Sequence, residues 1–390
     1  MNTSFIARNP SVLVFLALLA LFTLVVTVLS EGFGIGFIST SFVKTLGKTL
    51  CLCLVAVAMD LIWGYTGILS LGHFAFFGLG GYMVGMWLMF ERTRQIVVNS
   101  LSDGVLPPTP EEIKAAIGNQ IFGVVGSSEF PLIWAFADSI VLQLAFVVLV
   151  PGLLAFVFGW LAFRSRVTGV YLSILTQAMT LGLALYLFQN ASGLRGNNGL
   201  SGLQNLPGVT APQATVSLWF FWASAAALGA GYLLVAWVVS GKFGSVIRGI
   251  RDNEARVRFL GYSVESYKLA VFTLTACIAG IAGALYYPQA GIINPAEVAP
   301  IASIYLAVWV AIGGRGRLYG AVIGTAFVSL VSSWFTGGQA PDINLGFYTV
   351  KWVDWWLILL GLSFVLVTLY APRGMSGIID LMTRKKGEDR

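Results

Sequence analysis

The sequence predicts an all-α, polytopic membrane protein, a bundle of about ten transmembrane helices that forms one domain over residues 1–390. Hydrophobic residues make up 57% of the 390 residues, charged residues make up 10%, and the mean hydropathy is +0.84. Soluble domains carry about 25% charged residues. Too few charges therefore remain to cover a surface exposed to water, and lipid is the expected solvent.

Long apolar runs recur along the chain, and a helix needs about 20 apolar residues to cross a bilayer. The run 301–313 is short for a full span and the run 67–90 is rich in glycine, so we expect either one to be broken or re-entrant. The bundle is expected to cover 10–371, with a cytoplasmic tail at 372–390. The ten runs lie near 12–29, 43–62, 67–90, 139–162, 169–190, 216–240, 267–288, 301–313, 319–336 and 354–371.

The first run is interpreted as a helix that stays in the protein. A cleaved secretory leader is the alternative, because Arg8 gives the run a positive front. Its apolar length exceeds a usual leader core, and no A-x-A site follows at Ser30, Glu31 and Gly32. We therefore count it among the spans.

The lysines and arginines predict the orientation, because they concentrate in cytoplasmic loops. With the N-terminus inside, the inner segments hold 16 of the 23 basic residues and the outer segments hold 7. The reverse orientation would invert this bias. Both termini are therefore expected in the cytoplasm. The net charge of +6 is scattered, without the single basic stripe typical of nucleic-acid binding.

Two outer loops separate the early spans. The first, 91–138, contains three prolines and predicts a short helix around Glu111 to Ile117. The second, 191–215, is rich in turn-forming residues. Neither is long enough to suggest a second domain, and we expect the first to form a cap.

The inner loop 241–268 is the most informative segment. Ile247, Ile250, Val257 and Leu260 are spaced to form one apolar face of a helix, and Glu254 lies four residues before Arg258, a spacing that favours an ion pair. Either a helix on the anionic inner leaflet or a helix that docks on a cytoplasmic ATPase fits this pattern. The acidic residues Asp252 and Glu254 favour a protein partner, because anionic lipid headgroups attract only cations. The candidate coupling residues are Arg248, Arg251, Asp252, Asn253 and Glu254.

No feature predicts chemistry in this chain. The fragment Gly47-Lys48-Thr49 lacks the first glycine of a phosphate loop, where Phe42 stands instead. The three cysteines lie in apolar runs, and no metal cluster has suitable spacing. We expect no enzyme activity, no metal and no cofactor in this chain, with ATP and Mg²⁺ bound by partner subunits.

Small residues at spacings of four let helices approach closely in lipid. Contacts within one bundle are favoured over contacts between subunits. The candidate packing glycines are Gly81, Gly85, Gly280, Gly320 and Gly324.

Polar residues inside a membrane are candidates for a substrate path. For His73, a structural hydrogen bond to a neighbouring helix is favoured over contact with a solute or a proton, and Asp60 near the inner end of a span is interpreted as interfacial. The candidate path residues are His73, Thr176, Gln177, Thr180, Asn197 and Asn198.

Five sequence blocks resemble the branched-chain amino acid and urea permeases of bacterial ABC importers. They occur in the family's order and cover most of 45–378. The blocks are WGYTGILSLGHFAFFGLGGY from Trp63 to Tyr82, RVTGVYLSILTQAMT, FGSVIRGIRDNEARVRFLGYSVESYKLAVF, VAIGGRGRLYGAVIG and APRGMSGI.

Within this family the chain is most similar to the urea branch, and there to its second, methionine-type permease subunit. Gln177, the segment Gly196–Leu200 and the segment Gly313–Gly316 carry this similarity. Arg317 departs from the pattern, since a small hydroxyl residue is expected there. A neutral solute such as urea needs hydrogen-bond donors and acceptors without charge, which the uncharged path residues supply.

The resemblance implies a bacterial inner-membrane permease that moves urea or short amides into the cytoplasm by alternating access. It implies a homologous second permease, two cytoplasmic ATPases and a periplasmic solute-binding protein as partners, beside membrane lipid and without nucleic acid. The same machine for branched-chain amino acids is the first alternative. A secondary transporter or channel that works alone is the second.

Overall fold

The computed structural model describes residues 10–31, 36–101, 109–123, 130–167, 169–337, 343–344, 349–370 and 374–377. Helices dominate this part of the chain, and its strands form only two short antiparallel pairs. The predicted all-α fold class is confirmed. In these residues, eight helices are long and apolar enough to cross a membrane, and two shorter apolar helices occur at Pro300–Gly313 and Trp352–Val367.

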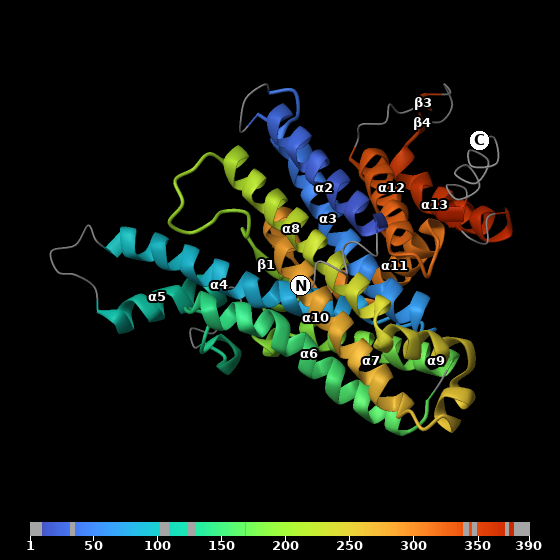
Figure 1. Ribbon diagram of the computed structural model, residues 1–390. Coiled ribbons are helices and arrows are strands. Elements are labelled where there is room, and N and C mark those ends of the chain that lie inside the picture. The colour runs from blue at the N-terminus through green and yellow to red at the C-terminus, as the bar shows by residue number, and fades with distance from the viewer. Residues whose placement is uncertain are drawn as a thin grey trace.

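Figure 1 shows the helices of the described residues; ten of the twelve long ones overlap the ten predicted runs, whereas α5 and α9 lie in predicted loops. The long helices are α2 (Pro10–Leu29), α3 (Thr40–Asp60), α4 (His73–Leu101), α5 (Pro110–Phe122), α6 (Ile140–Arg164), α7 (Val170–Phe188), α8 (Gln213–Ser240), α9 (Lys242–Phe259), α10 (Val264–Ala290), α11 (Pro300–Gly313), α12 (Leu318–Thr336) and α13 (Trp352–Tyr370). The short elements are the π-helix η1 (Leu61–Tyr65), the 3₁₀ turns η3 (Leu132–Trp134), η4 (Asn190–Ser192), η5 (Gly196–Asn198) and η6 (Pro295–Val298), and the strands β1 (Leu200–Ser201), β2 (Ile292–Ile293), β3 (Ile343–Asn344) and β4 (Thr349–Val350).

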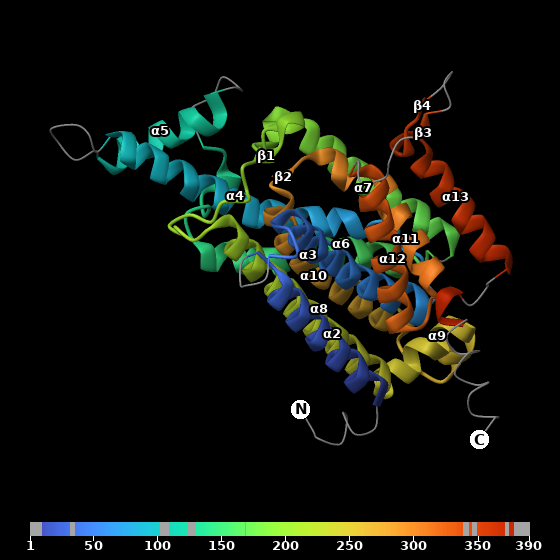
Figure 2. The ribbon, with the colours of Figure 1, turned by 90° about the horizontal axis from the view of Figure 1, so that it is seen from above.

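Helices α3, α4 and α10 form the centre of the bundle. Helix α10 packs against α3, α4 and α6, and α3 also packs against α8 and α12. Helix α2 lies along α8, and α13 lies at the edge beside α11 and α12 (Figures 1 and 2). The outer helices expose large apolar side chains, among them Leu18 and Leu24 of α2. Such a surface suits contact with lipid.

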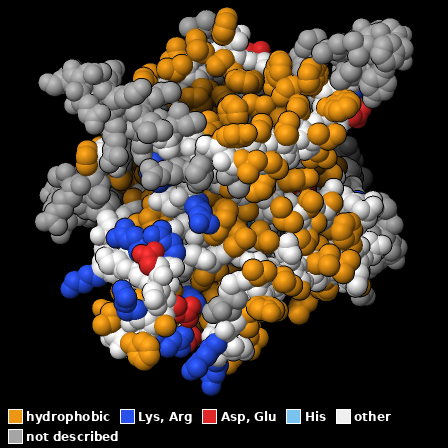
Figure 3. Space-filling model, turned by 90° about the vertical axis from the view of Figure 1, so that its right-hand side faces the viewer, with side chains coloured by type: hydrophobic (Ala, Val, Ile, Leu, Met, Phe, Trp, Pro, Cys, Tyr) orange, Lys and Arg blue, Asp and Glu red, His pale blue; other side chains and the backbone are white. Residues whose placement is uncertain are grey.

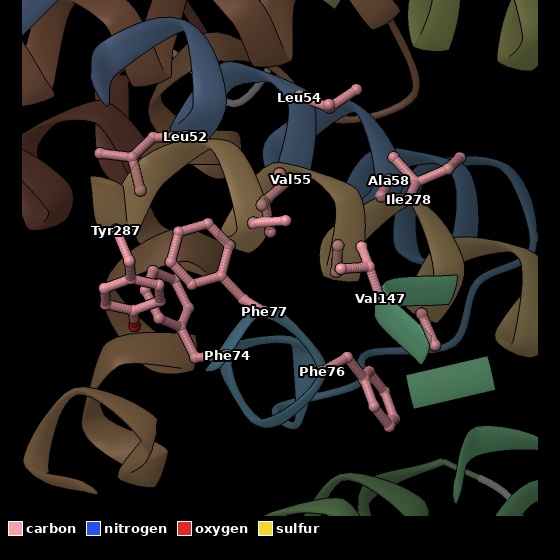
Figure 4. Close-up of a cluster of buried hydrophobic side chains, with 14 of the residues drawn as sticks. Leu52, Leu54, Val55, Ala58, Phe74, Phe76, Phe77, Val147, Ile278 and Tyr287 are labelled. Atoms are coloured by element: carbon pink, nitrogen blue, oxygen red, sulfur yellow. The ribbon is translucent and has the colours of Figure 1, made fainter. Parts of the chain in front are cut away.

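Aromatic residues at the start of α4 fill the space between α3 and α10. The rings of Phe74 and Phe77 lie beside Tyr287 (Figure 4), and the centroids of Phe77 and Tyr287 are 5.4 Å apart. Phe76 faces Phe272 of α10 edge-on at 5.5 Å. Burial of these side chains supplies packing energy where three helices meet.

The glycine-rich run 67–90 is broken near its beginning, which confirms the expectation for this run. Helix α3 ends in the π-helix η1, a non-helical segment occupies residues 66–72, and α4 then continues without interruption from His73 to Leu101. The glycines permit close packing, since a Cβ on Gly80 would collide with the carbonyl of Gly280. The other weak span, α11, has 14 residues and is indeed short.

The predicted loop 91–138 is partly helical. Arg92 and Arg94 lie on α4, which extends to Leu101, and the predicted short helix is confirmed as α5. Thr109 and Glu112 form a capping box at its N-terminus, so two orphan N–H groups are satisfied. Strands β1 and β2 then pair the segments that follow α7 and α10, with Leu200 opposite Ile293.

Candidate functional site

Helix α9 lies across one end of the bundle, between α8 and α10 (Figure 1). We call this end the α9 end, and we call the opposite end the α5 end. The predicted inner loop 241–268 consists of α9, a short turn and the beginning of α10, which starts at Val264. The charged residues of this loop are therefore held by two helices.

A kink divides α9 at Asn253. The backbone there is extended, with φ −159° and ψ 95°, and the side-chain Oδ1 accepts a hydrogen bond from the N–H of Arg256 at 3.0 Å. This contact is the usual N-cap interaction of asparagine. Asn253 thus ends one helical segment and begins the next.

The apolar face of α9 is buried against the bundle. Ile247, Ile250 and Val257 are at most 7% exposed, whereas Leu260 is 71% exposed. The prediction was wrong for Leu260, because the helix ends at Phe259 and Gly261 turns the chain with φ +87°. The helical spacing no longer applies beyond that point.

Ion pairs join α9 to α10. Glu254 contacts Arg258 at 3.0 Å, which confirms the predicted pair. Glu254 also contacts the largely buried Lys268 at 2.6 Å, and Arg258 contacts Glu265 at 2.6 Å. Because Glu254 serves two cations of the same chain, it holds the second segment of α9 against α10.

The five candidate coupling residues take different positions. Asp252 and Asn253 are exposed, and Arg248 is half-buried. Arg251 donates from Nε to Asp252 at 3.0 Å and from Nη1 to the carbonyl of Gly64 at 2.8 Å. Beside them lies a cavity of about 230 Å³, lined by α9, residues 66–68 and the start of α7. Their role in ATPase coupling stays a prediction.

An exposed apolar tip, which the sequence did not suggest, projects from the α9 end. We define the tip as residues 259–262. Phe259 is 92% exposed, Leu260 71% and Tyr262 45%. The only sequence signal was an apolar pair followed by glycine at the end of a charged helix. Figure 3 shows Lys, Arg and acidic side chains gathered in the lower part of a face that is otherwise largely hydrophobic.

Three of the predicted path residues come together at the start of α4. His73 is completely buried, and neither ring nitrogen has a hydrogen-bond partner on a neighbouring helix. The hydrogen bond that the sequence favoured is therefore not formed. Thr176 and Thr180 of α7 are also buried and lie beside the preceding segment: a Cβ on Gly72 would be 3.2 Å from Oγ1 of Thr180.

The α7 hydroxyls hold the segment 66–72 in place. Thr176 Oγ1 accepts the N–H of Leu71 at 3.0 Å, and Ser173 Oγ donates to the carbonyl of Leu69 at 2.7 Å. These bonds satisfy backbone groups that no helix satisfies. Ser173 and Thr176 of α7 thus have a structural role. Gln177, the half-buried residue after Thr176, does not take part in these hydrogen bonds.

Asn197 and Asn198 lie apart from this cluster. They are exposed in η5, which follows the far end of α7. From Thr176 to Phe188 the helix rises about 18 Å along its axis. The structure therefore places the two asparagines toward the α5 end and does not bring them to His73.

The candidate packing glycines contact other helices of the same chain. A Cβ on Gly280 would meet the carbonyl of Val147, and one on Gly81 would meet the ring of Tyr287. Gly85 faces Leu200 of β1. Gly320 and Gly324 both approach Gly313, so α11 and α12 pack backbone to backbone.

A buried polar group in the centre was not singled out from the sequence. Gln289 of α10 donates to Ser224 of α8 at 3.0 Å, and the thiol of Cys51 donates to the same hydroxyl at 3.2 Å. These residues stand singly inside apolar runs, so spacing gave no signal. Interhelical hydrogen bonds of this kind add to packing in a membrane.

Arg317 has a structural explanation. Its Nη1 donates to the carbonyl of Ser376 at 3.1 Å and contacts the hydroxyl of Tyr319 at 3.3 Å. The arginine thus fastens residues 374–377 to the beginning of α12. A small hydroxyl side chain would not reach that carbonyl.

The fold and the site define a class of protein: a multi-pass helical membrane protein whose charged crossing helix lies at one end of the bundle. The family described as "Branched-chain amino acid transport system / permease component" matches residues 41–368, and the chain belongs to this family. The match extends from α3 to α13 and leaves out α2.

Individual relatives match shorter stretches. The high-affinity branched-chain amino acid transport system permease protein LivM of Escherichia coli (strain K12) is 29% identical over 132 residues, which is 34% of this chain and 28% of the relative; LivM of Salmonella typhimurium gives the same values. The autoinducer 2 import system permease protein LsrC of Escherichia coli O9:H4 is 30% identical over 105 residues, 25% of this chain and 31% of the relative. The chain thus matches less than a third of each relative's length. No solved structure matches the chain.

Proposed function

We propose that this chain is a membrane-spanning subunit of an ATP-driven importer in the bacterial inner membrane, moving a small polar solute into the cytoplasm. Both termini and α9 lie on the cytoplasmic side. The observation that carries the proposal is the crossing helix α9, which combines a buried apolar face, exposed charges and the exposed tip. The charge bias of the loops supports this orientation.

A protein partner explains the surface of α9 better than a lipid surface does. Asp252 is exposed beside the basic residues, and an anionic leaflet would repel it. Phe259 is almost fully exposed at the same place, and aromatic anchors of this kind dominate protein interfaces. We therefore infer that α9 docks on a cytoplasmic ATPase.

The remaining partners follow from the family. A homologous second permease completes the membrane part, two ATPases bind ATP and Mg²⁺, and a periplasmic solute-binding protein delivers the solute. ATP-driven closure of the ATPases moves α9 and tilts the bundle between its inward and outward states. This is alternating access by coupled rigid bodies.

For the cargo we propose urea or a short amide. The sequence blocks resemble the urea branch, and the polar groups near the start of α4, Thr176 and Thr180 with Gln177, are uncharged. Branched-chain amino acids are the second candidate, favoured by the name of the LivM relatives. Labelled uptake in cells lacking this chain separates the two: lost leucine uptake with unchanged urea uptake removes the first.

The docking of α9 is tested by the subunits that purify with the tagged chain from detergent-solubilised membranes. We expect an ATPase and a second permease, and an isolated chain that transports solute in liposomes without ATP would refute the proposal. The orientation is tested separately with Asn253→Cys. An impermeant thiol reagent should leave Cys at this position unmodified in intact spheroplasts and modify it after lysis.

A further inference from the structure

The end of α3 is capped by a residue of α9. The last carbonyls of a helix lack partners within that helix. Here Thr66 Oγ1 donates to Leu61 and the N–H of Ile68 donates to Ile62. The carbonyl of Gly64 accepts from Arg251 at 2.8 Å. A charged side chain of the crossing helix thus completes the hydrogen bonding of η1.

Gly67 brings α9 still closer to the same place. Its φ of +80° lies in the region that favours glycine. A Cβ there would be 2.9 Å from Cγ and 3.3 Å from Cα of Arg251. The backbone of α9 and the segment after η1 are therefore in direct contact.

Asp60 links the same helix end to a second element. Its side chain is completely buried, and its Oδ1 accepts the N–H of Gly316 at 2.6 Å. Gly316 lies in the connection between α11 and α12. This hydrogen bond runs from a backbone N–H to a side-chain carboxyl oxygen. It joins residues 256 positions apart in the sequence.

Two further contacts surround this bond. A Cβ on Gly64 would collide with both Oδ1 of Asp60 and the N–H nitrogen of Gly316, so only glycine admits the approach. The guanidinium of Arg315 lies over the ring of Trp63, 5.5 Å from its centroid. Residues 60–67, 314–317 and Arg251 therefore form one contiguous body, which we call the junction.

The junction continues into the middle of the bundle. The segment 66–72 leads from it to α4 and is bonded to Thr176 and Ser173 of α7. The first residues of α4 are bonded to α11, where Ser303 Oγ accepts the N–H of Phe74 at 3.1 Å. Hydrogen bonds therefore hold the chain on both sides of the buried His73, from the junction to α7 and α11.

We infer that Asp60 and Arg251 transmit movement of α9 to the paired ends of α3 and α11, so that Asp60 is a positioning residue for energy coupling. The inference rests on the proposed function. Arg251 then acts inside the permease, through Gly64, and the exposed tip is left to contact the partner. Coupling carried by two discrete hydrogen bonds predicts that breaking either one separates ATP hydrolysis from transport.

The test uses the complete complex with its binding protein in liposomes, and measures solute taken up per ATP hydrolysed. In Asp60→Ala and Arg251→Ala we expect ATP hydrolysis to persist and the uptake per ATP to fall at least about fivefold, the low end of usual coupling strengths. Asp60→Asn keeps an acceptor oxygen and Arg251→Lys keeps a donor, so both should retain most of the coupling. Asp354→Ala, an exposed acid on α13, is the matched control.

The outcomes distinguish failure of the proposed function from failure of the inference about Asp60 and Arg251. If the wild-type complex shows no ATP-driven uptake, the proposed function is refuted, and the inference that rests on it is refuted as well. Wild-type uptake together with an unchanged ratio in Asp60→Ala overturns the inference alone. If Asp60→Ala does not accumulate in the membrane, the Arg251→Ala variant decides. A lower uptake per ATP with normal co-purification of the ATPase supports the inference. Lost co-purification, or an unchanged uptake per ATP, overturns the inference.

Discussion

The carboxylate of Glu254 accepts a hydrogen bond from the ammonium of Lys268 at 2.6 Å, although only 8% of the Lys268 side chain is exposed. This pair fastens the second segment of α9 to α10. An ammonium in such a place depends on its partner, because an unpaired buried charge is costly.

Glu254→Gln should therefore destabilise the protein by about 1–3 kcal/mol, the usual cost of a buried group that loses its partner. The measurement is the thermal unfolding midpoint of the purified chain in detergent. Glu91→Gln removes the carboxylate of the more exposed Glu91–Arg94 pair and should cost less than about 1 kcal/mol. Equal shifts in the two variants would contradict this assignment.

Gly64→Ala should be among the most disruptive single-methyl changes in the chain. The new Cβ would overlap Asp60 and the backbone at Gly316, and overpacking costs about 1–3 kcal/mol. Gly182→Ala is the control, because no atom lies within 4 Å of its Cβ position on α7 and alanine favours helix by about 1 kcal/mol. The two unfolding midpoints should move in opposite directions, and a shared upward shift would disprove the close approach.

Phe259→Asp should leave the fold intact and weaken ATPase binding. Exposed positions usually tolerate substitution within about 0.5 kcal/mol, whereas loss of an aromatic anchor costs about 2 kcal/mol or more of binding. Leu132→Asp changes a residue that is 89% exposed at the α5 end. Co-purification of the ATPase should fall only in the Phe259 variant. Undiminished binding there would show that the tip faces something else.

Thr109→Ala should loosen α5. Loss of an N-cap threonine should speed amide exchange in the first turn about fivefold, as read by hydrogen exchange with mass spectrometry.

A second prediction for α5 concerns pH. The hydrogen bonds from the backbone and side chain of Thr109 lower the pKa of Glu112 from its ordinary value of 4.5. Stabilisation by ionised Glu112 is therefore fully present above pH 4.5 and is lost as the pH falls through the lowered pKa. Wild-type α5 should lose protection on acidification, and Glu112→Gln should not share this loss.

Hydropathy and charge predicted the parts of the fold that depend on local composition. The span positions, the short α11, the helix α5 and the Glu254–Arg258 pair follow from apolar length, capping residues and four-residue spacing. These signals act between residues that are close in sequence. They located α9 as the element most suited to a partner.

Long-range contacts left no trace in such patterns. Asp60 was interpreted as an interfacial acid, yet its partner lies on the connection between α11 and α12. The glycines of the run 67–90 predicted a break, but they recur from Gly67 to Gly85 and therefore did not place it at 66–72. His73 and Thr176 were chosen as isolated polar residues, and only the packing of α7 on the segment before α4 brings them together.

The pairing of Leu200 with Ile293 fastens the segments that follow α7 and α10 at the α5 end. The helices that precede these segments, α7 and α10, are therefore tied to each other at the end of the bundle opposite α9. A change in the angle between them would leave this end in place and would be largest at the α9 end, where the exposed Phe259 lies.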